Sequence, residues 1–431
     1  MIERFVNKKL RFGRKAKGLV ACLIIGVLIV SFLVFLPQQR DSLGHWLNSL
    51  ASGPKSPGLI ESAETVNSTV WRAVATSAWA YFQLGVGVDS KTGLPYAGAS
   101  EFKGFTDWDL GVYIQAVIDA QKIGLISVNG AWGANERLDN VVRFLETRPL
   151  NETTNYPFWF YDGTNGKDYH ALSDKATTPV DGADTGRLLV ALSNLRNYDD
   201  GLFASRINYV VYNRTDYTDL VDGIANASIS DNIYAYYIYS GYGSFWPSQV
   251  GEVPTEILDN ILSKETITAN GVILPKVPLT CEPLLCSIFE ISNVDSRLSN
   301  LMKQVYLAHE AHYNATGQFV AFSEGNSLTK QFIYEWIVAP NGGTWKITND
   351  AQTLYYNIDP IIYSKVAFSF LSLYNTTYSY NLAVHVEKIL PTPTEGYLSG
   401  IDTTGKIIPS VGSNTNGLIL GAALYAIQNE R

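Results

Sequence analysis

The sequence predicts an all-α protein, an (α/α)6 toroid with small β-hairpin insertions, preceded by one N-terminal transmembrane helix. About a dozen segments carry apolar residues three and four positions apart, which is the spacing of one helix face, and strands do not alternate regularly with helices. An almost unbroken apolar run lies near the start of the chain. With 431 residues, 46% of them hydrophobic, the chain can bury a large core.

The apolar run, "GLVACLIIGVLIVSFLVFLP" (18–37), has about the length of a helix that crosses a bilayer, roughly 20 residues. Polar residues follow Pro37 instead of the small residues of a cleavage site, which favours an uncleaved anchor over a signal peptide. Basic residues stay on the cytoplasmic side, so we expect the chain after the anchor to lie outside. The expected parts are a cytoplasmic basic tail (1–18), a transmembrane anchor (19–36), a stalk (37–60) and an extracellular domain (61–431).

Charge is distributed unevenly along the chain. Residues 1–40 carry eight basic side chains and one acidic side chain, whereas residues 41–431 carry 24 basic and 39 acidic ones. The acidic body does not suit a nucleic-acid partner, and the apolar run suits a lipid bilayer. We therefore expect a single-pass protein of the cell membrane with a cytoplasmic N-terminus. Six N-x-S/T sequons give weak support for an outside location: Asn67, Asn151, Asn213, Asn226, Asn314 and Asn375.

The three cysteines leave two interpretations open. Cys22 lies in the expected anchor, so Cys281 and Cys286 are the only pair outside it. A disulfide between them suits an oxidising compartment, although this spacing on one regular helix turns the side chains apart. Two buried, small hydrophobic side chains are the alternative.

Twelve helices are expected from the apolar spacing, and two strand-like runs interrupt them. The strand-like runs, "FWFY" (158–161) and "QFIYEWIV" (331–338), would form hairpins on one rim. In chain order the helices are expected at 70–81, 110–120, 138–145, 188–195, 203–210, 233–240, around 257–261, after Glu282, and at 298–308, 363–374, 382–389 and 416–427.

In a toroid of helical hairpins the even-numbered helices can form the inner ring, so that their N-terminal ends surround one cleft. The entrances to helices two, four, eight, ten and twelve read "TDWD", "VDGADTGR", "LTCEP", "NIDP" and "GSNTN". Helix capping accounts for a single Asp, Asn or Thr at such a place. It does not require two carboxylates at one entrance, or the aromatic residues beside them.

Clustered acids and aromatic rings are typical of a carbohydrate site. Apolar sugar faces stack on aromatic rings, and polar side chains hold the hydroxyls. The chain has 9 Trp and 26 Tyr, although many of these rings must belong to the core. Hydrolysis of a glycosidic bond needs one carboxylic acid to protonate the leaving oxygen and a second carboxylate as base or nucleophile.

Other kinds of site are not indicated. "AHEAH", with His309 and His312, lacks the four-residue step between the histidines of a zinc-binding HExxH helix. "GVGVDSKTGLP" lacks the Lys-Ser/Thr ending of a phosphate-binding loop, and "FSEGN" is not a nucleophile elbow. We therefore expect no metal and no cofactor.

Six segments in the same order resemble the DUF3131 family. They are "DSKTGLP", "TDWDLGVYIQAVIDAQKIGLI", "VDGADTGRLLVALSNL", "IYAYYIYSGYGSFWP", "TCEPLLCSIFEI" and "GSNTNGLILGAALYAI". The resemblance covers about residues 65–430 and implies (α/α)6-type proteins of unassigned function, related in pattern to glucoamylase-like and endo-β-1,2-glucanase groups. "GSFWPS" replaces the usual Trp-Gly of the family's aromatic helix, and the cysteines that bracket "CEPLLC" are unusual.

The resemblance also implies a set of site residues made of carboxylates, aromatic rings, an arginine and amides. Expected to bind substrate are Asp107, Trp108, Asp181, Arg187, Tyr242, Trp246, Tyr334, Glu335, Asn414 and Asn416. Expected to act in catalysis are Glu282, Asp109, Asp184 and Glu324.

On these grounds we expect a membrane-anchored, extracellular glycoside hydrolase that acts on a polysaccharide or other glycan. Glu282 is the favoured general acid, because a carboxyl beside proline in an apolar stretch would have a raised pKa, and Glu324 is the second candidate. Asp109 or Asp184 would be the base, with Asp107 as a helix cap or support. Inversion is expected if the two carboxyls stand roughly 6.5–9.5 Å apart.

Two other functions remain open from the sequence. The first is a non-catalytic surface protein that binds glycan or packs in the cell envelope. The second is a polysaccharide lyase, which normally uses a Tyr or His base.

Overall fold

The computed structural model describes residues 66–99, 101–152, 154–169, 181–349, 358–391 and 394–430. These residues belong to one compact unit, Pro57–Arg431. The expected tail, anchor and stalk (1–60) lie outside the described residues. Within the described ranges, no helix is both long enough and apolar enough to cross a membrane.

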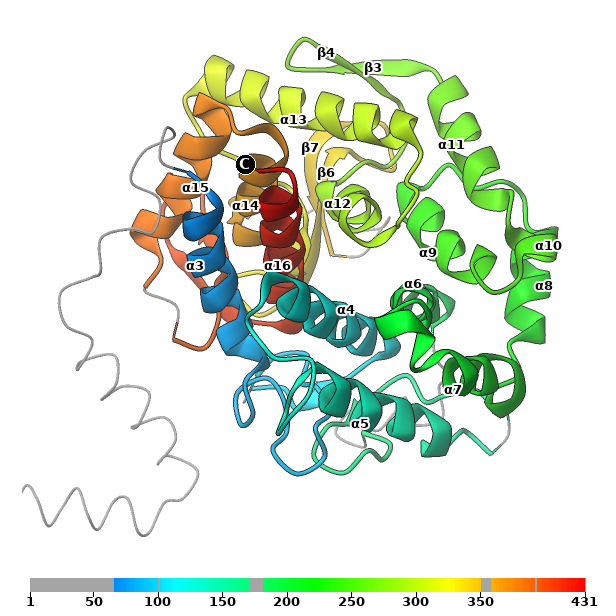
Figure 1. The fold of residues 1–431 in the computed structure, drawn as a ribbon. Coiled ribbons are helices and arrows are strands. Elements are labelled where there is room, and N and C mark those ends of the chain that lie inside the picture. The colour runs from blue at the N-terminus through cyan, green and yellow to red at the C-terminus, as the bar shows by residue number, and fades with distance from the viewer. Residues whose placement is uncertain are drawn as a thin grey trace, which may run out of the picture. The chain divides into compact units, whose positions relative to one another are not determined.

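Six helices form a closed inner ring, in which each helix contacts the next and the last contacts the first (Figure 1). They all correspond to even-numbered helices of the sequence-based prediction, so the predicted (α/α)6 arrangement is confirmed. The inner helices are α4 (Asp107–Ile123), α6 (Gly182–Arg196), α9 (Ile233–Gly243), α12 (Cys281–Glu290), α14 (Ser364–Tyr374) and α16 (Ser413–Gln428).

The odd-numbered predicted helices pack around the outside of this ring (Figure 1). Two further short helices, α8 (Thr218–Asn226) and α10 (Pro247–Val250), were not predicted. The outer helices are α3 (Ser68–Trp79), α5 (Ala134–Thr147), α7 (Ala204–Tyr209), α11 (Val253–Ser263), α13 (Ser296–Thr316) and α15 (Thr377–Ile389). Three short helical turns, at Ala80–Phe82, Asp199–Gly201 and Val210–Arg214, complete the helical elements of the described residues.

Sequence explains which helices lie inside. Inner helix α4 buries residues on all its sides, whereas outer helix α5 buries a single face that includes Leu138, Val141 and Leu145. Two glycines let α6 and α9 approach closely: a Cβ on Gly241 would lie 2.1 Å from the carbonyl oxygen of Gly186. Because no larger residue fits there, these glycines fix the distance between the two helices.

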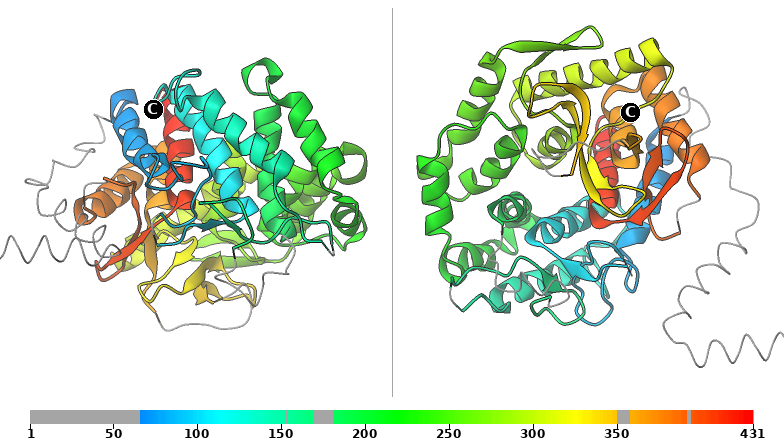
Figure 2. Two further views of the ribbon diagram at one scale, coloured as in Figure 1. Left: turned by 90° about the horizontal axis from the view of Figure 1, so that it is seen from below. Right: turned by 180° about the vertical axis from the view of Figure 1, so that it is seen from behind.

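Three small sheets lie at the end of the ring where the inner helices begin (Figure 2, left). The expected strand at 331–338 is confirmed as the middle strand β6, whereas in 158–161 only Tyr161 is in a strand. All pairings are antiparallel: β1 (Gly104–Phe105) with β2 (Tyr161–Asp162), β6 (Phe332–Val338) with β5 (Glu324–Asn326) and β7 (Thr344–Thr348), and β9 (Leu398–Asp402) with β8 (Ile361–Tyr363) and β10 (Ile407–Val411). A separate hairpin, β3 (Thr266–Ala269) with β4 (Val272–Pro275), contacts α11 and α13.

Two local expectations need correction or completion. "NIDP" is not the entrance of the tenth helix, because strand β8 follows it and α14 begins only at Ser364. Cys281 and Cys286, both on α12, are buried free thiols, so the structure supports the interpretation as small buried side chains and not the disulfide.

Candidate active site

The N-terminal ends of α4, α6 and α16 open into a cleft of about 840 Å3, which we call the front cleft. Strands β5, β6 and β10 complete its walls. Free N–H groups and the positive ends of helix dipoles point toward such a place, and both stabilise negative charge. Among the residues that the structure describes, five carboxylate side chains line the front cleft: Glu101, Asp109, Asp181, Asp184 and Glu324.

Asp109 is held on both of its oxygens. One oxygen accepts hydrogen bonds from the Thr106 N–H (3.1 Å) and forms the capping box of α4, and the other accepts from the Ser413 hydroxyl (2.7 Å). Burial raises the pKa of Asp109, although the Ser413 bond partly opposes that effect. Its carboxyl therefore joins α4 to α16 while facing the cleft.

Asp184 lies beside Asp109 and Asp181 at the start of α6. Asp181 is the N-cap of α6, where its side chain accepts from the Ala183 N–H at 2.9 Å. Burial, and then the like charges of Asp181 and Asp109, raise the pKa of Asp184 well above its ordinary value. Asp184 caps no helix and is half-buried in the cleft lining, so its carboxyl can meet a ligand there.

Glu324 lies on β5, where strand β5 meets the cleft. It is 8% exposed, and the Tyr234 hydroxyl donates a hydrogen bond to it. Burial first, and the nearby charge of Glu282 second, raise the pKa of Glu324 to about 8. Glu324 is therefore a carboxylic acid, able to give up a proton, at neutral pH.

Glu282 does not have the apolar surroundings that the sequence predicted. Its carboxylate is fully buried and forms an ion pair with Lys365, and it accepts hydrogen bonds from Ser323 (2.8 Å) and from the Asn414 amide. Lys365 lies 83 residues away and lines the cleft. This ion pair places Glu282 beside Glu324 and behind the residues that line the cleft.

Arg187 connects this wall to the ring interior. Its guanidinium donates to Asn414 at 3.1 Å and to Glu290 at 2.7 Å, and it lies 4.5 Å from the centre of the Trp108 ring. Arg187 is only 1% exposed, so it orients Trp108 and Asn414 from below. Those two side chains, unlike Arg187, line the cleft.

Besides Glu282 and Arg187, five further predicted site residues do not line the cleft. Each is held by contacts to other parts of the protein. Asp107 is buried in an ion pair with Arg148 (2.6 Å), Tyr242 is buried and donates to the Gly182 carbonyl (2.9 Å), Trp246 packs among Tyr212, Tyr217 and Phe245, Glu335 on the opposite face of β6 accepts from the Ile361 N–H (2.7 Å), and Asn416 holds the backbone of Tyr397.

Aromatic rings complete the cleft, and of these the sequence singled out Tyr334 but not Trp336, Trp159 or Phe160. Tyr334 stacks on Trp336 with ring centres 5.8 Å apart on one wall. Trp159 and Phe160, which directly precede strand β2 in the chain, also line the cleft. Tyr234 and Lys365 were also missed; a lysine in the apolar helix "YSKVAF" was the one signal in the sequence, because a buried lysine needs a partner.

Nothing in this geometry implies a bound metal. Over the described ranges, no group of three or more His, Cys, Asp or Glu side chains is placed to hold a metal ion. What the cleft offers is a protonated carboxyl, further carboxylates and stacked rings.

Comparison with known proteins gives one family and one fold. The family described as "Protein of unknown function (DUF3131)" matches residues 73–231 and 260–429. No curated protein matches the chain.

Solved structures with the same fold share little sequence with this chain. The endo-β-1,2-glucanase of Chitinophaga pinensis, in complex with sophorotriose and glucose, has a TM-score of 0.60 and 14% identity over 85% of this chain and 94% of its own. The endo-β-1,2-glucanase of Talaromyces funiculosus with sophorose has 0.58 and 12%, over 86% and 88%. A candidate glucoamylase from Bacteroides caccae has 0.59 and 13%, over 86% and 94%. These similarities show the toroid fold.

Proposed function

Because the chain belongs to the DUF3131 family, to which no reaction is assigned, we propose its function from the cleft: it is a glycoside hydrolase. The observation that carries the proposal is the buried Glu324, which accepts a hydrogen bond from Tyr234, lies near the Glu282–Lys365 pair and shares one cleft with Asp184 and Asp109. This is the pairing of an acid with separate carboxylates that glycosidic hydrolysis requires.

The reaction follows from these roles. Glu324 gives its proton to the leaving glycosidic oxygen as the bond from that oxygen to the anomeric carbon breaks. Asp184 takes a proton from the water that attacks the anomeric carbon, so both carboxyls exchange their protonation states. Asp109, with both oxygens bonded, supports Asp184 and adds the like charge that makes it a stronger base.

The charges and rings of the cleft favour a neutral glycan. Lys365 is the single basic residue among the described residues that line it, and its ammonium is paired with Glu282. A polysaccharide lyase must neutralise a uronate carboxylate, and this acidic cleft would repel one. The endo-β-1,2-glucanases with the same fold bind neutral glucose oligosaccharides, sophorose and sophorotriose, which agrees with such a substrate.

A panel of neutral polysaccharides, with release of reducing ends as the readout, tests the proposal. We expect at least one β-glucan to be cleaved by the purified protein and not by its Glu324→Gln variant. If both proteins bind a glycan equally well and neither cleaves it, the protein is a non-catalytic glycan-binding protein and not a hydrolase. A product that absorbs in the ultraviolet would indicate a lyase.

We also propose that this domain works outside the cell, fixed by the segment 19–36. The basic tail and apolar run of the sequence support this location. Protease treatment of intact cells tests it: the domain should be digested while residues 1–18 stay protected.

A further inference from the structure

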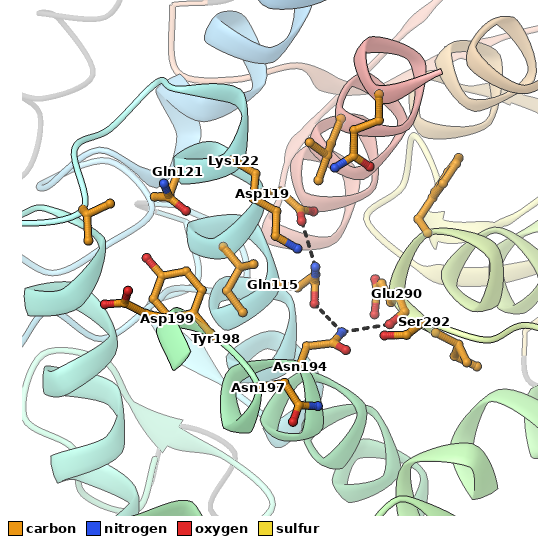
Figure 3. Close-up of a pocket in the computed structure, with 16 residues that line it drawn as sticks. Gln115, Asp119, Gln121, Lys122, Asn194, Asn197, Tyr198, Asp199, Glu290 and Ser292 are labelled. Carbon is orange, nitrogen blue, oxygen red and sulfur yellow. Dashed lines mark hydrogen bonds between the residues drawn. The ribbon is translucent and has the colours of Figure 1, made fainter. Parts of the chain in front are cut away.

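A second cavity of about 470 Å3 lies where inner helices α4, α6, α12 and α16 end, and we call it the rear pocket (Figure 3). Gln115, Asp119, Asn194, Asn197, Phe289 and Lys122 are among its lining residues. None of these residues lines the front cleft. The rear pocket is therefore a separate place on the ring.

A row of hydrogen bonds forms one wall of the rear pocket (Figure 3). The Asn194 amide donates to the Glu290 carbonyl and to Gln115, and Gln115 donates to Asp119, each at 2.8 Å. Gln115 and Asp119 are 7% and 2% exposed. Burying amides and a carboxyl in a helical core is costly unless they are fully bonded, so this row is a built feature.

The row nevertheless has unused acceptors. The second carboxyl oxygen of Asp119 and the side-chain oxygens of Asn194 and Asn197 accept no hydrogen bond from the described residues. Donors on the same wall include the Lys122 ammonium and further amides. Neighbouring hydrogen-bond acceptors and donors suit a ligand with hydroxyl groups, because each hydroxyl both donates and accepts hydrogen bonds.

The charged side chains of the rear pocket favour a neutral ligand over an ionic one. The carboxylate of Glu290 is already paired with Arg187 at 2.7 Å, and Lys122 lies close enough to Asp119 to favour its charged form. Burial raises the pKa of Asp119 to about 7, so this carboxyl is not a full negative charge at neutral pH. The apolar face of Phe289 adds a surface on which a ring can stack.

We propose that the rear pocket binds a small neutral polyhydroxylated molecule, a free monosaccharide or cyclic polyol, through Asp119, Asn194 and Asn197. Its size suits one such ring. The proposal does not rest on the hydrolase function, because binding here uses no residue of the front cleft.

Binding of a panel to the full-length protein, measured by calorimetry and ligand-observed NMR, tests the proposal. The panel holds glucose, galactose, xylose, inositol and sorbitol, with putrescine as a cationic comparison. We expect at least one neutral member to bind with a Kd on the order of 1 mM. Asn194→Leu and Asn197→Leu should each weaken it at least tenfold, whereas Asp184→Asn in the front cleft should not change it.

The outcomes that overturn the proposal are distinct. One is that no neutral member binds below about 50 mM, or that putrescine alone binds. Another is that Asp184→Asn abolishes binding while Asn194→Leu and Asn197→Leu both keep it. That result would place the ligand in the front cleft. Asn194→Leu removes two internal hydrogen bonds, so if circular dichroism shows that it unfolds, the exposed Asn197→Leu decides alone.

Discussion

The two ends of the inner ring are built from the same helices but carry opposite chemistry. At the front cleft the helices begin, and their free N–H groups and dipoles favour the carboxylates Asp109, Asp181 and Asp184. At the rear pocket the helices end, and amides and a half-charged carboxyl line the wall. Helix direction, together with the strands that close the front cleft, therefore separates an acidic, aromatic cleft suited to bond cleavage from an amide-rich pocket suited to binding.

The largest expected effect is the loss of the acid at the front cleft. Glu324→Gln should lower kcat by about 100- to 10,000-fold, because the glutamine cannot protonate the leaving oxygen. Glu101→Gln, an exposed carboxylate on the same cleft, is the matched control and should keep most of the activity. Steady-state kinetics on the best polysaccharide measure both. Equal losses in the two variants would mean that Glu324 has no special role.

A second prediction separates a supporting carboxylate at the entrance of α4 from a working one at the entrance of α6. Asp107→Asn should destabilise the protein by about 3–5 kcal/mol, because it leaves the buried Arg148 unpaired. Asp184→Asn should leave the stability nearly unchanged and remove the activity. Urea unfolding and turnover are measured on both variants: we expect Asp107→Asn to lose mainly stability and Asp184→Asn to lose mainly activity. An inactive but fully stable Asp107→Asn protein would contradict it.

A third prediction concerns the pH profile of kcat/KM. Activity should fall on the alkaline side near pH 8, as Glu324 loses its proton. Tyr234→Phe removes a hydrogen bond that stabilises the carboxylate, so the pKa of Glu324 rises and the fall should move to higher pH. Glu282→Gln removes the neighbouring negative charge, so the same fall should move to lower pH. Shifts of the same sign in both variants would exclude Glu324 as the titrating acid.

The smallest expected effect tests the stacked aromatic wall of the front cleft. Tyr334→Ala should raise KM roughly 3- to 10-fold with little change in kcat, since a stacked ring contributes about 0.5–1.5 kcal/mol to sugar binding. Tyr209→Ala, on outer helix α7, removes an exposed tyrosine far from the ring interior and is the control. A tenfold loss of kcat with unchanged KM would instead make Tyr334 part of the chemistry.

The sequence predicted the ring well because helical periodicity is a local signal. Each inner helix carries apolar residues on every side or polar residues at its first turn, so its identity could be recognised without its partners. The same locality explains the incorrect surroundings predicted for Glu282: its neighbours in sequence are Pro283, Leu284 and Leu285, while its partner Lys365 comes from another helix. An ion pair over 83 residues has no local signature.

Position along a helix or strand is a second reason why some predicted site residues lie outside the cleft. Tyr242 and Trp246 belong to an aromatic segment, but they lie at or just past the end of α9, nine and thirteen residues after its first residue, Ile233. Glu335 shares a strand with Tyr334, and alternation along the strand turns the two to opposite faces. The rear pocket escaped prediction altogether because its amides are single residues on separate helices.

Closure of the ring by α16 has a consequence for biosynthesis. This helix packs against both α3 and α4, and it supplies Ser413 and Asn414, which hold Asp109 and Glu282. During translation, some 290 residues must therefore emerge after α4 before its carboxylate meets the final partner. Until then the growing chain exposes an apolar seam between its first and last hairpins. A chain that stops before Ser413 would leave that seam open, and we expect it to be sent to chaperones or proteases.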